Sequence, residues 1–146
     1  MKASRKLAIS DVLRVGLKPV GDGFYSLLLE DEEFALVDVV GVVTGNFISE
    51  NSNYAFLTLA DGSGGLIRVK AWGSQVKLLV NPLTGELYGK GDVLRVIGFV
   101  RGFRGERYLV PLVIVRLNNP LALLVRELEL IYEKAQKVLG HEKPKG

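Results

Sequence analysis

Apolar and polar side chains alternate along the middle of the chain, which is typical of β-strands with one buried face. A Val-rich run at residues 34–47 precedes this region and contains Gly41 and Gly45. Glycine within a long strand often marks a bulge or bend, which a small barrel needs where one strand serves two sides. Four shorter alternating runs follow at residues 54–60, 66–72, 93–100 and 108–115. The pattern predicts an all-β domain, a five-stranded Greek-key barrel.

The connections between these runs predict two tight turns and one short helix. Residues 61–65, Asp-Gly-Ser-Gly-Gly, suit a hairpin turn between the second and third strands. The last two strands flank Arg-Gly-Phe-Arg-Gly-Glu-Arg at residues 101–107, whose glycines permit a tight reversal. In the segment 73–88 apolar residues recur at helical spacing, at Val76, Leu79 and Val80. A helix between the third and fourth strands closes the bottom of a barrel of this kind.

After residue 116 the apolar period lengthens to between three and four, which predicts a C-terminal α-helix. Asn119 is suited to cap this helix and Pro120 to occupy its first position. We expect the helix within residues 118–139, followed by a polar tail at 140–146. The apolar stripe of the helix consists of Leu121, Leu124, Leu128, Ile131, Ala135 and Val138. Its regular spacing favours a helix bundle shared between subunits over docking across the protein's own barrel.

Residues 1–33 are predicted to form an N-terminal extension to a barrel domain at residues 34–117. Ser10 can cap a short helix in this extension, although the same segment suits a strand at the barrel edge equally well. A glycine-rich turn at 21–23 precedes a short predicted strand at 24–30. These predictions divide the chain into an extension, a barrel, a helix and a tail.

Alternation also decides which side chains share the face of the sheet that points away from the core. In the third strand Arg68, Lys70 and Trp72 fall on that face. Aromatic rings stack on bases whatever their sequence, and cations meet phosphates. This combination predicts a nucleic-acid-binding face, with stacking assigned first to Trp72 and Phe103. The predicted members are Trp72, Phe103, Arg68, Lys70, Arg95, Arg101, Arg104, Arg107, Tyr54 and Phe56.

Each of these features has a structural alternative. Trp72 can be a core tryptophan, and Phe103 can pack against its own hairpin. The arginines of the hairpin tip can serve only to discourage aggregation of the sheet edge. We favour the binding interpretation because Arg68 and Lys70 share a face of the same strand with Trp72.

Charge is distributed unevenly along the chain. The formal net charge is +3 and the pI is near 9.2, a mild basic bias that permits nucleic acid without requiring it. Residues 21–38 carry six acids and no base, whereas residues 61–116 carry nine bases against four acids. The basic surface therefore coincides with the predicted barrel, and the acidic run at 30–33 is typical of a solvated turn.

Composition argues against an enzyme, a metal site and a cofactor. The chain has no cysteine, and its single histidine, His141, lies in the polar tail. Thiolate catalysis, cysteine-ligated zinc and histidine-based triads therefore have no basis in this sequence. The turn at 61–65 lacks the Gly-Lys-Ser/Thr ending of a phosphate-binding loop. We expect a non-catalytic protein without a small-molecule substrate.

The sequence also carries no sign of membrane insertion or export. No apolar run approaches the about 18 residues that a transmembrane helix needs. The N-terminal MKASRK is not followed by the compact apolar segment of a signal peptide. We therefore expect a cytoplasmic protein without a membrane partner.

Four segments resemble the OB-fold of the replication protein A family. They are VVGVVTGNF, YAFLTLADGSGGLIRVKAW, GDVLRVIGFVRGFRGERYLVP and LLVRELELIYEKA, within residues 34–137. The likeness is greatest to the middle-sized subunit and its archaeal relatives, with the Stn1-type domain of telomere-capping complexes as a cousin. The segment RKLAISDVL is also similar to the lead-in of archaeal members. No Ser-rich N-terminal tail and no winged-helix domain after residue 139 is seen, so the regulatory and recruiting roles of eukaryotic members are not implied.

The resemblance implies an OB-fold subunit of a heteromeric complex that binds single-stranded DNA in replication, repair or recombination. In that family, one aromatic residue ends the third strand and another lies in the hairpin between the fourth and fifth strands, and both hold the ligand. Trp72 and Phe103 match these two positions. The family's C-terminal helix joins helices of partner subunits, and residues 120–139 match it. The partners implied are single-stranded DNA and other OB-fold subunits.

We therefore hypothesise a subunit that binds single-stranded DNA by stacking and phosphate contacts, largely without sequence preference. Two alternatives remain open. One is a structural assembly subunit of that complex, or of a telomere-capping-like complex, with little DNA affinity of its own. The other is an RNA-binding OB-fold protein, since stacking and phosphate contacts do not distinguish the two sugars.

Overall fold

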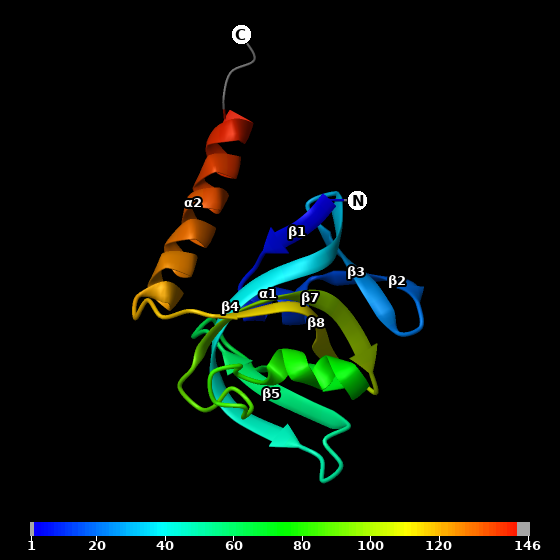
Figure 1. The fold of residues 1–146 in the computed structure, drawn as a ribbon. Coiled ribbons are helices and arrows are strands. Elements are labelled where there is room, and N and C mark those ends of the chain that lie inside the picture. Colours follow the sequence, from blue (N-terminus) through cyan, green and yellow to red (C-terminus); the bar gives the residue numbers. More distant parts are fainter. Residues whose placement is uncertain (1, 143–146) are drawn as a thin grey trace.

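A barrel with one long helix beside it makes up the computed structural model, which describes residues 2–142 and the side chains of residues 4–140. In Figure 1 the helix α2 (Ala122–Glu142) stands to one side of the barrel. The other elements are β1 (Lys2–Lys6), α1 (Ile9–Arg14), β2 (Gly16–Gly21), β3 (Phe24–Leu29), β4 (Glu32–Ile48), β5 (Tyr54–Ala60), β6 (Ile67–Trp72), the 3-10 helix η1 (Gly73–Leu79), β7 (Val93–Phe103) and β8 (Glu106–Arg116).

The long strand β4 closes the barrel because it pairs with two strands along its length. Residues 36–42 run antiparallel to β7, and residues 42–48 run antiparallel to β5. The register shifts just before Gly45, within the region of the predicted bend. At Gly41 a Cβ atom would lie 3.2 Å from the Ala60 carbonyl oxygen, so a side chain there would crowd β5. A short parallel contact between β6 and β8 completes the ring, and the predicted five-stranded Greek-key barrel is confirmed.

Side chains at every second strand position fill the barrel. Leu57 and Val69 are fully buried, as the alternation predicts. The helix η1 follows β6 directly and packs Val76 and Leu79 against the same core. Val80 lies beyond η1 and forms an isolated bridge with the segment before β7, so it is not part of the helix. The short helix predicted between the third and fourth strands is therefore present, as a 3-10 helix.

The N-terminal extension is built into the barrel. β1 runs parallel to β4, and β3 pairs with both β4 and β7. Ile9 and Val12 of α1 are fully buried in the barrel core. The segment is a helix, but Ser10 is its second residue and not its cap, which corrects that prediction. The N–H groups of Ile9 and Ser10 instead donate to the side chains of Asp61 and Ser63, at 2.9 and 3.0 Å.

The C-terminal helix begins and ends slightly later than predicted. The Asn119 side chain accepts a hydrogen bond from the Leu121 N–H at 2.9 Å, and α2 starts one residue later. Gly140 lies inside α2, which continues to Glu142. A glycine in a helix costs about 1 kcal/mol relative to alanine, which is too little to end a helix by itself. The rest of the predicted tail, residues 143–146, lies outside the described residues.

Candidate nucleic-acid interface

Five aromatic side chains form a continuous row on the outer surface of the barrel. Phe47, Phe56, Tyr54, Trp72 and Tyr108, in this order, are called the aromatic row. Successive ring centroids are 5.4, 6.1, 5.2 and 6.0 Å apart. The register of β4, β5 and β6 brings Phe47 opposite Phe56 and Tyr54 opposite Trp72. Because the rings come from neighbouring strands, they form one broad apolar surface on the side away from the core.

The members of the aromatic row differ in how far they are exposed. Trp72 is 43% exposed and Phe47 is similarly open, so neither belongs to the core. Tyr54 and Phe56 are half-buried beside them. Tyr108 is only 4% exposed and forms the floor at the end of the row. The open rings are free to stack on flat groups, while the buried ones fix their positions.

Burial raises the pKa of Tyr54 above its ordinary value of 10.0, with Arg68 opposing and Glu106 reinforcing the effect. The phenol is therefore uncharged throughout the physiological pH range. The middle of the aromatic row presents neutral rings to any ligand that carries phosphate charge.

Two cations lie on the aromatic row, and the Glu106 carboxylate forms ion pairs with both. The Arg68 guanidinium is 4.5 Å from the Phe56 ring centroid, and the Lys70 ammonium is 4.4 Å from the Tyr108 ring centroid. Glu106 Oε1 lies 2.7 Å from Lys70 Nζ, and Glu106 Oε2 lies 3.9 Å from Arg68 Nη1. Because the carboxylate offsets one of the two positive charges, the local basic character is modest.

Phe103 and Arg104 form an exposed tip at one edge of this surface. Arg104 and Gly105 have φ angles of 51° and 81°, which is the conformation of a two-residue hairpin turn. Phe103 is 62% exposed, and it lies opposite Glu106 in the register of β7 and β8. The Arg104 guanidinium is 5.1 Å from the Phe103 ring centroid. The tip therefore places a ring and a cation next to the carboxylate that holds Lys70.

The structure places two predicted arginines, Arg95 and Arg107, away from the aromatic row, and a third, Arg101, at its end opposite Tyr108. Arg95 forms two-point contacts with Asp38 near α2, on another sector of the barrel. Arg107 donates to the carbonyl oxygens of Val12 and Val15 at 3.1 and 2.7 Å and so caps the end of α1. Arg101 lies 5.1 Å from the ring centroid of a residue in β3, Phe24.

The physical reason is that the barrel is closed. Alternation separates inward from outward positions but does not give the sector of the barrel on which an outward side chain lies. The prediction that Arg95 lies on the same binding surface as Trp72 is therefore wrong. The prediction that Arg107 lies beside Trp72 is also wrong. Arg107 pairs with Gly102 and precedes Tyr108 by one residue, so the two side chains lie on opposite faces of β8.

Sequence reasoning left three members of this surface out of the predicted site. Phe47 lies at the end of β4, and its side matches that of Phe56 only once the bulge before Gly45 is known. Tyr108 is placed by the parallel register that sets it opposite Arg68. Glu106 was a tip residue among arginines, and only the fold brings it to Lys70.

The apolar stripe of α2 faces away from the barrel. The exposed stripe residues are Leu121, Leu124, Leu128, Ile131, Ala135 and Val138. Val125, Tyr132 and Leu139 are also exposed and widen this surface. Docking of the stripe across the protein's own barrel, the alternative to a shared bundle, is therefore not what the structure shows.

Polar side chains hold α2 to the barrel. Arg126 is buried, and its Nη2 lies 3.0 Å from Asp38 Oδ1 while its Nη1 donates to the Asp38 carbonyl oxygen at 2.9 Å. Asp38 is only 1% exposed and also accepts from Arg95 at 2.6 Å. Burial by itself raises the pKa of Asp38, but the hydrogen bonds from Arg95 and the charge of Arg126 outweigh it, so the pKa lies below its ordinary value of 3.8. Asp38 is therefore ionised and ties β4, β7 and α2 together.

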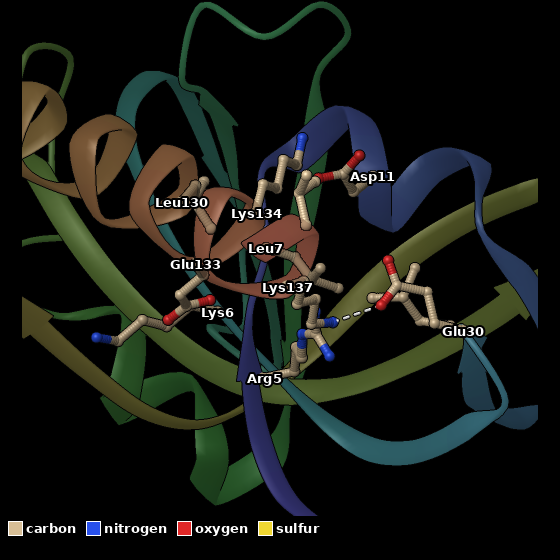
Figure 2. A pocket seen from close by; sticks show the side chains of 11 residues that line it. Arg5, Lys6, Leu7, Asp11, Glu30, Leu130, Glu133, Lys134 and Lys137 are labelled. Carbon is tan, nitrogen blue, oxygen red and sulfur yellow. Dashed lines mark hydrogen bonds and ion pairs between the residues drawn. The ribbon is translucent and has the colours of Figure 1, made fainter. Parts of the chain in front are cut away.

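A cavity of about 350 Å³ separates the second half of α2 from β1 and β3. Figure 2 shows Lys137 of α2 reaching across it to Glu30, whose Oε2 lies 2.7 Å from Lys137 Nζ. Leu7 and Leu130 line the same space. The far half of the helix thus touches the barrel through long charged side chains around a cavity.

Two further observations concern other classes of site. Within residues 2–142 no helix is both long and apolar enough to cross a membrane. The described residues also contain no group of three or more His, Cys, Asp or Glu side chains placed to hold a metal ion.

No protein-family model matches the chain, and no curated protein sequence matches it. Solved structures do. The S. pombe Stn1-Ten1 complex matches with a TM-score of 0.72 at 21% identity, over 94% of this chain and 96% of that one. A replication protein A heterotrimer bound to single-stranded DNA matches with a TM-score of 0.67 at 20% identity, over 91% and 96%. Yeast replication protein A bound to single-stranded DNA matches with a TM-score of 0.61 at 23% identity, over 88% and 87%.

The barrel is an OB-fold. The likenesses extend over nearly the whole chain, so they include the N-terminal extension and α2 as well as the five barrel strands. The predicted fold class, an OB-fold barrel with a C-terminal helix, is confirmed. The solved structures come from the same two groups of complexes that the sequence segments resemble. At this level of identity the likeness establishes the fold of the chain.

Proposed function

We propose that this OB-fold protein binds single-stranded DNA as a subunit of a heteromeric, replication protein A-like complex in replication, repair or recombination. The observation that carries the proposal is the aromatic row with Arg68 and Lys70 on it. Two of the structures with the same fold are complexes with single-stranded DNA. An open aromatic surface with cations beside it is the arrangement that proteins use to bind single strands.

Binding proceeds by stacking and by charge neutralisation. Bases stack on the open rings of Trp72 and Phe47, and Phe103 provides a further ring from the hairpin tip. Arg68 and Lys70 contact phosphates beside the stacked bases. Each stacked base contributes about 1–3 kcal/mol, so a few rings give appreciable affinity. Every base has an aromatic face, so this mode carries little sequence preference.

The exposed stripe of α2 is the proposed contact with other OB-fold subunits. An apolar helical surface of this length is rarely left in water in a monomeric protein. The polar side of α2 already holds the helix to the barrel through Arg126, which leaves the apolar side available. A helix from another subunit, packed by interlocking apolar side chains, fits this surface best. The complexes with the same fold are a heterotrimer and a Stn1-Ten1 complex, both heteromeric by name.

A second candidate is a structural assembly subunit with weak DNA affinity of its own. The observation in its favour is Glu106, which already occupies Lys70 and Arg68. In that case α2 carries the main function, and the aromatic row contributes only when several linked barrels bind one strand.

A gel-shift titration with matched single-stranded DNA, duplex DNA and single-stranded RNA tests the proposal. We expect binding to single strands and little binding to the duplex, whose bases are stacked and closed to the rings. A preference for RNA over DNA would replace the proposal with an RNA-binding role. Absence of binding to every ligand, together with tight association with an OB-fold partner, would favour the assembly role.

A further inference from the structure

A groove of about 520 Å³ lies on the barrel surface between the β2-β3 hairpin and strands β7 and β8. A site of this volume is in the range that accommodates small planar groups. The residues of its wall and floor that matter below are Val20, Phe24, Gln75, Phe99, Val110 and Leu112. We call it the hairpin groove.

The hairpin groove begins where the aromatic row ends. Gln75, in η1, follows Trp72 by three residues, and Val110, in β8, follows Tyr108 by two residues on the same face of the strand. Phe99 lies opposite Val110 in the register of β7 and β8 and continues the surface toward β3. A strand laid along the aromatic row and past Tyr108 therefore arrives at the groove.

Two phenylalanine rings and the carboxylate of Asp22 line the groove, and a cation lies beside it. Phe24 and Phe99 meet edge to face, with ring centroids 6.0 Å apart and an interplanar angle of 82°. The Arg101 guanidinium lies 5.1 Å from the Phe24 ring centroid, and Arg101 is the register partner of Tyr108. The cation thus lies between the end of the aromatic row and the groove. The same pairing of ring and guanidinium occurs on the aromatic row, where Arg68 lies over Phe56.

We propose that the hairpin groove binds one further nucleobase of the DNA strand held on the aromatic row, with the adjoining phosphate on Arg101. This inference rests on the proposed function. It commits to a nucleobase because the groove is continuous with the stacking surface and has a cation at the junction. The β2-β3 hairpin, which lies outside the five barrel strands, thereby lengthens the binding path and gives Arg101 a ligand contact away from Trp72.

The test is a length series of oligothymidines from about 3 to about 16 nucleotides, a span that covers the usual footprint of one OB-fold. Quenching of the fluorescence of Trp72, the only tryptophan in the chain, reports binding. The variant Leu112→Glu places a charge at the groove; Leu112 is 51% exposed, so the fold should tolerate the change. The control is Leu83→Glu, since Leu83 is exposed and lines neither the groove nor the aromatic row.

Short oligomers that cover only the aromatic row should bind the wild type, Leu112→Glu and Leu83→Glu with similar affinity. On longer oligomers the wild type and Leu83→Glu should gain roughly tenfold as the strand reaches the groove, and Leu112→Glu should not. A second variant, Arg101→Gln, should reduce the salt dependence of binding by about one phosphate contact, and only for the longer oligomers.

An equal gain with length in the wild type and Leu112→Glu, with unchanged salt dependence in Arg101→Gln, would overturn the groove assignment while leaving the proposed function intact. The groove would then belong to a protein segment or to no ligand. Absence of binding at every length would overturn the proposed function together with the groove. The two failures are therefore distinguishable.

Discussion

Lys70 Nζ lies 2.7 Å from Glu106 Oε1, beside the aromatic row and next to the hairpin tip. The carboxylate thus occupies a cation that belongs to the aromatic row, because the Lys70 ammonium also lies 4.4 Å from the Tyr108 ring centroid. A phosphate and Glu106 therefore compete for the same ammonium group.

Replacing Glu106 by Gln should strengthen binding to single-stranded DNA. The Glu106 side chain is 38% exposed, and ion pairs screened by solvent are worth about 0.2–1 kcal/mol, so freeing Lys70 and Arg68 should raise affinity by up to about fivefold. The dependence of log affinity on log salt should steepen by about 0.7 for one additional phosphate contact. Fluorescence anisotropy at several salt concentrations measures both effects.

Glu86→Gln is the matched control, because Glu86 is an exposed acid in the loop before β7. It removes the same charge and should change affinity less than Glu106→Gln. A loss of affinity in Glu106→Gln would show that the carboxylate contacts the ligand directly and does not compete with it.

Replacing Asp38 by Asn should destabilise the fold and loosen α2. Asp38 is buried and paired with two arginines, and removing one partner from a buried ion pair costs about 3–5 kcal/mol. Because Arg95 is partly exposed, we expect a loss near the lower end, about 3 kcal/mol. Urea unfolding measures the change in the free energy of unfolding. The control is the exposed ion pair of Lys137 with Glu30, where Glu30→Gln should cost less than about 1 kcal/mol.

The same variant should change the response to acid. The pKa values of Asp38 and Glu129 lie below their ordinary values of 3.8 and 4.5, the latter because of the hydrogen bond from Lys6. A lowered folded-state pKa contributes stability that is fully present above the ordinary value and is lost as pH falls through the folded value. The wild type should therefore lose stability as the pH falls below about 5, and Asp38→Asn should lose less. Parallel acid profiles for the two proteins would contradict the assignment.

Charges placed in the stripe of α2 should abolish association without unfolding the chain. Leu128 and Ile131 are exposed, so Leu128→Glu with Ile131→Glu should change the free energy of unfolding by no more than about 0.5 kcal/mol per site. The wild type alone should self-associate as its concentration rises, because its apolar stripe is uncovered. Sedimentation velocity should show the double variant as a monomer. Gln136→Glu adds charge outside the stripe and should behave like the wild type.

Much of the barrel follows from the sequence because β5, β6 and β7 keep a regular alternation of buried and outward residues. Leu57 and Val69 are core residues for that reason, and Trp72 is on the outer surface for the same reason. The apolar stripe of α2 can also be predicted from the sequence, because apolar residues spaced three and four apart lie on one side of a helix. The spacing does not tell whether that side of the helix packs on the barrel. In this structure the contact of Arg126 with Asp38 turns the opposite side of α2 toward the barrel.

The remaining features depend on register between strands that are distant in sequence. Tyr108 joins the aromatic row through the parallel contact of β8 with β6. Arg95 lies away from it because the first half of β7 pairs with β4, where Arg95 meets Asp38. Phe24 reaches β7 only because the N-terminal extension folds back as part of the sheet. The local pattern of apolar and polar residues predicts which side chains point into or out of the barrel. Which outward side chains are neighbours depends on how the barrel closes.

The measurement that tests the central claim most directly is the affinity of Trp72→Ala with Phe103→Ala for a labelled oligothymidine, by fluorescence anisotropy. Both side chains are exposed, so the melting temperature should change little, and Leu83→Ala is the control for loss of an exposed apolar side chain. Loss of two stacking contacts at about 1–3 kcal/mol each predicts a decrease in affinity of at least roughly 25-fold. Unchanged affinity in a folded double variant would contradict the proposal that this surface binds single-stranded DNA.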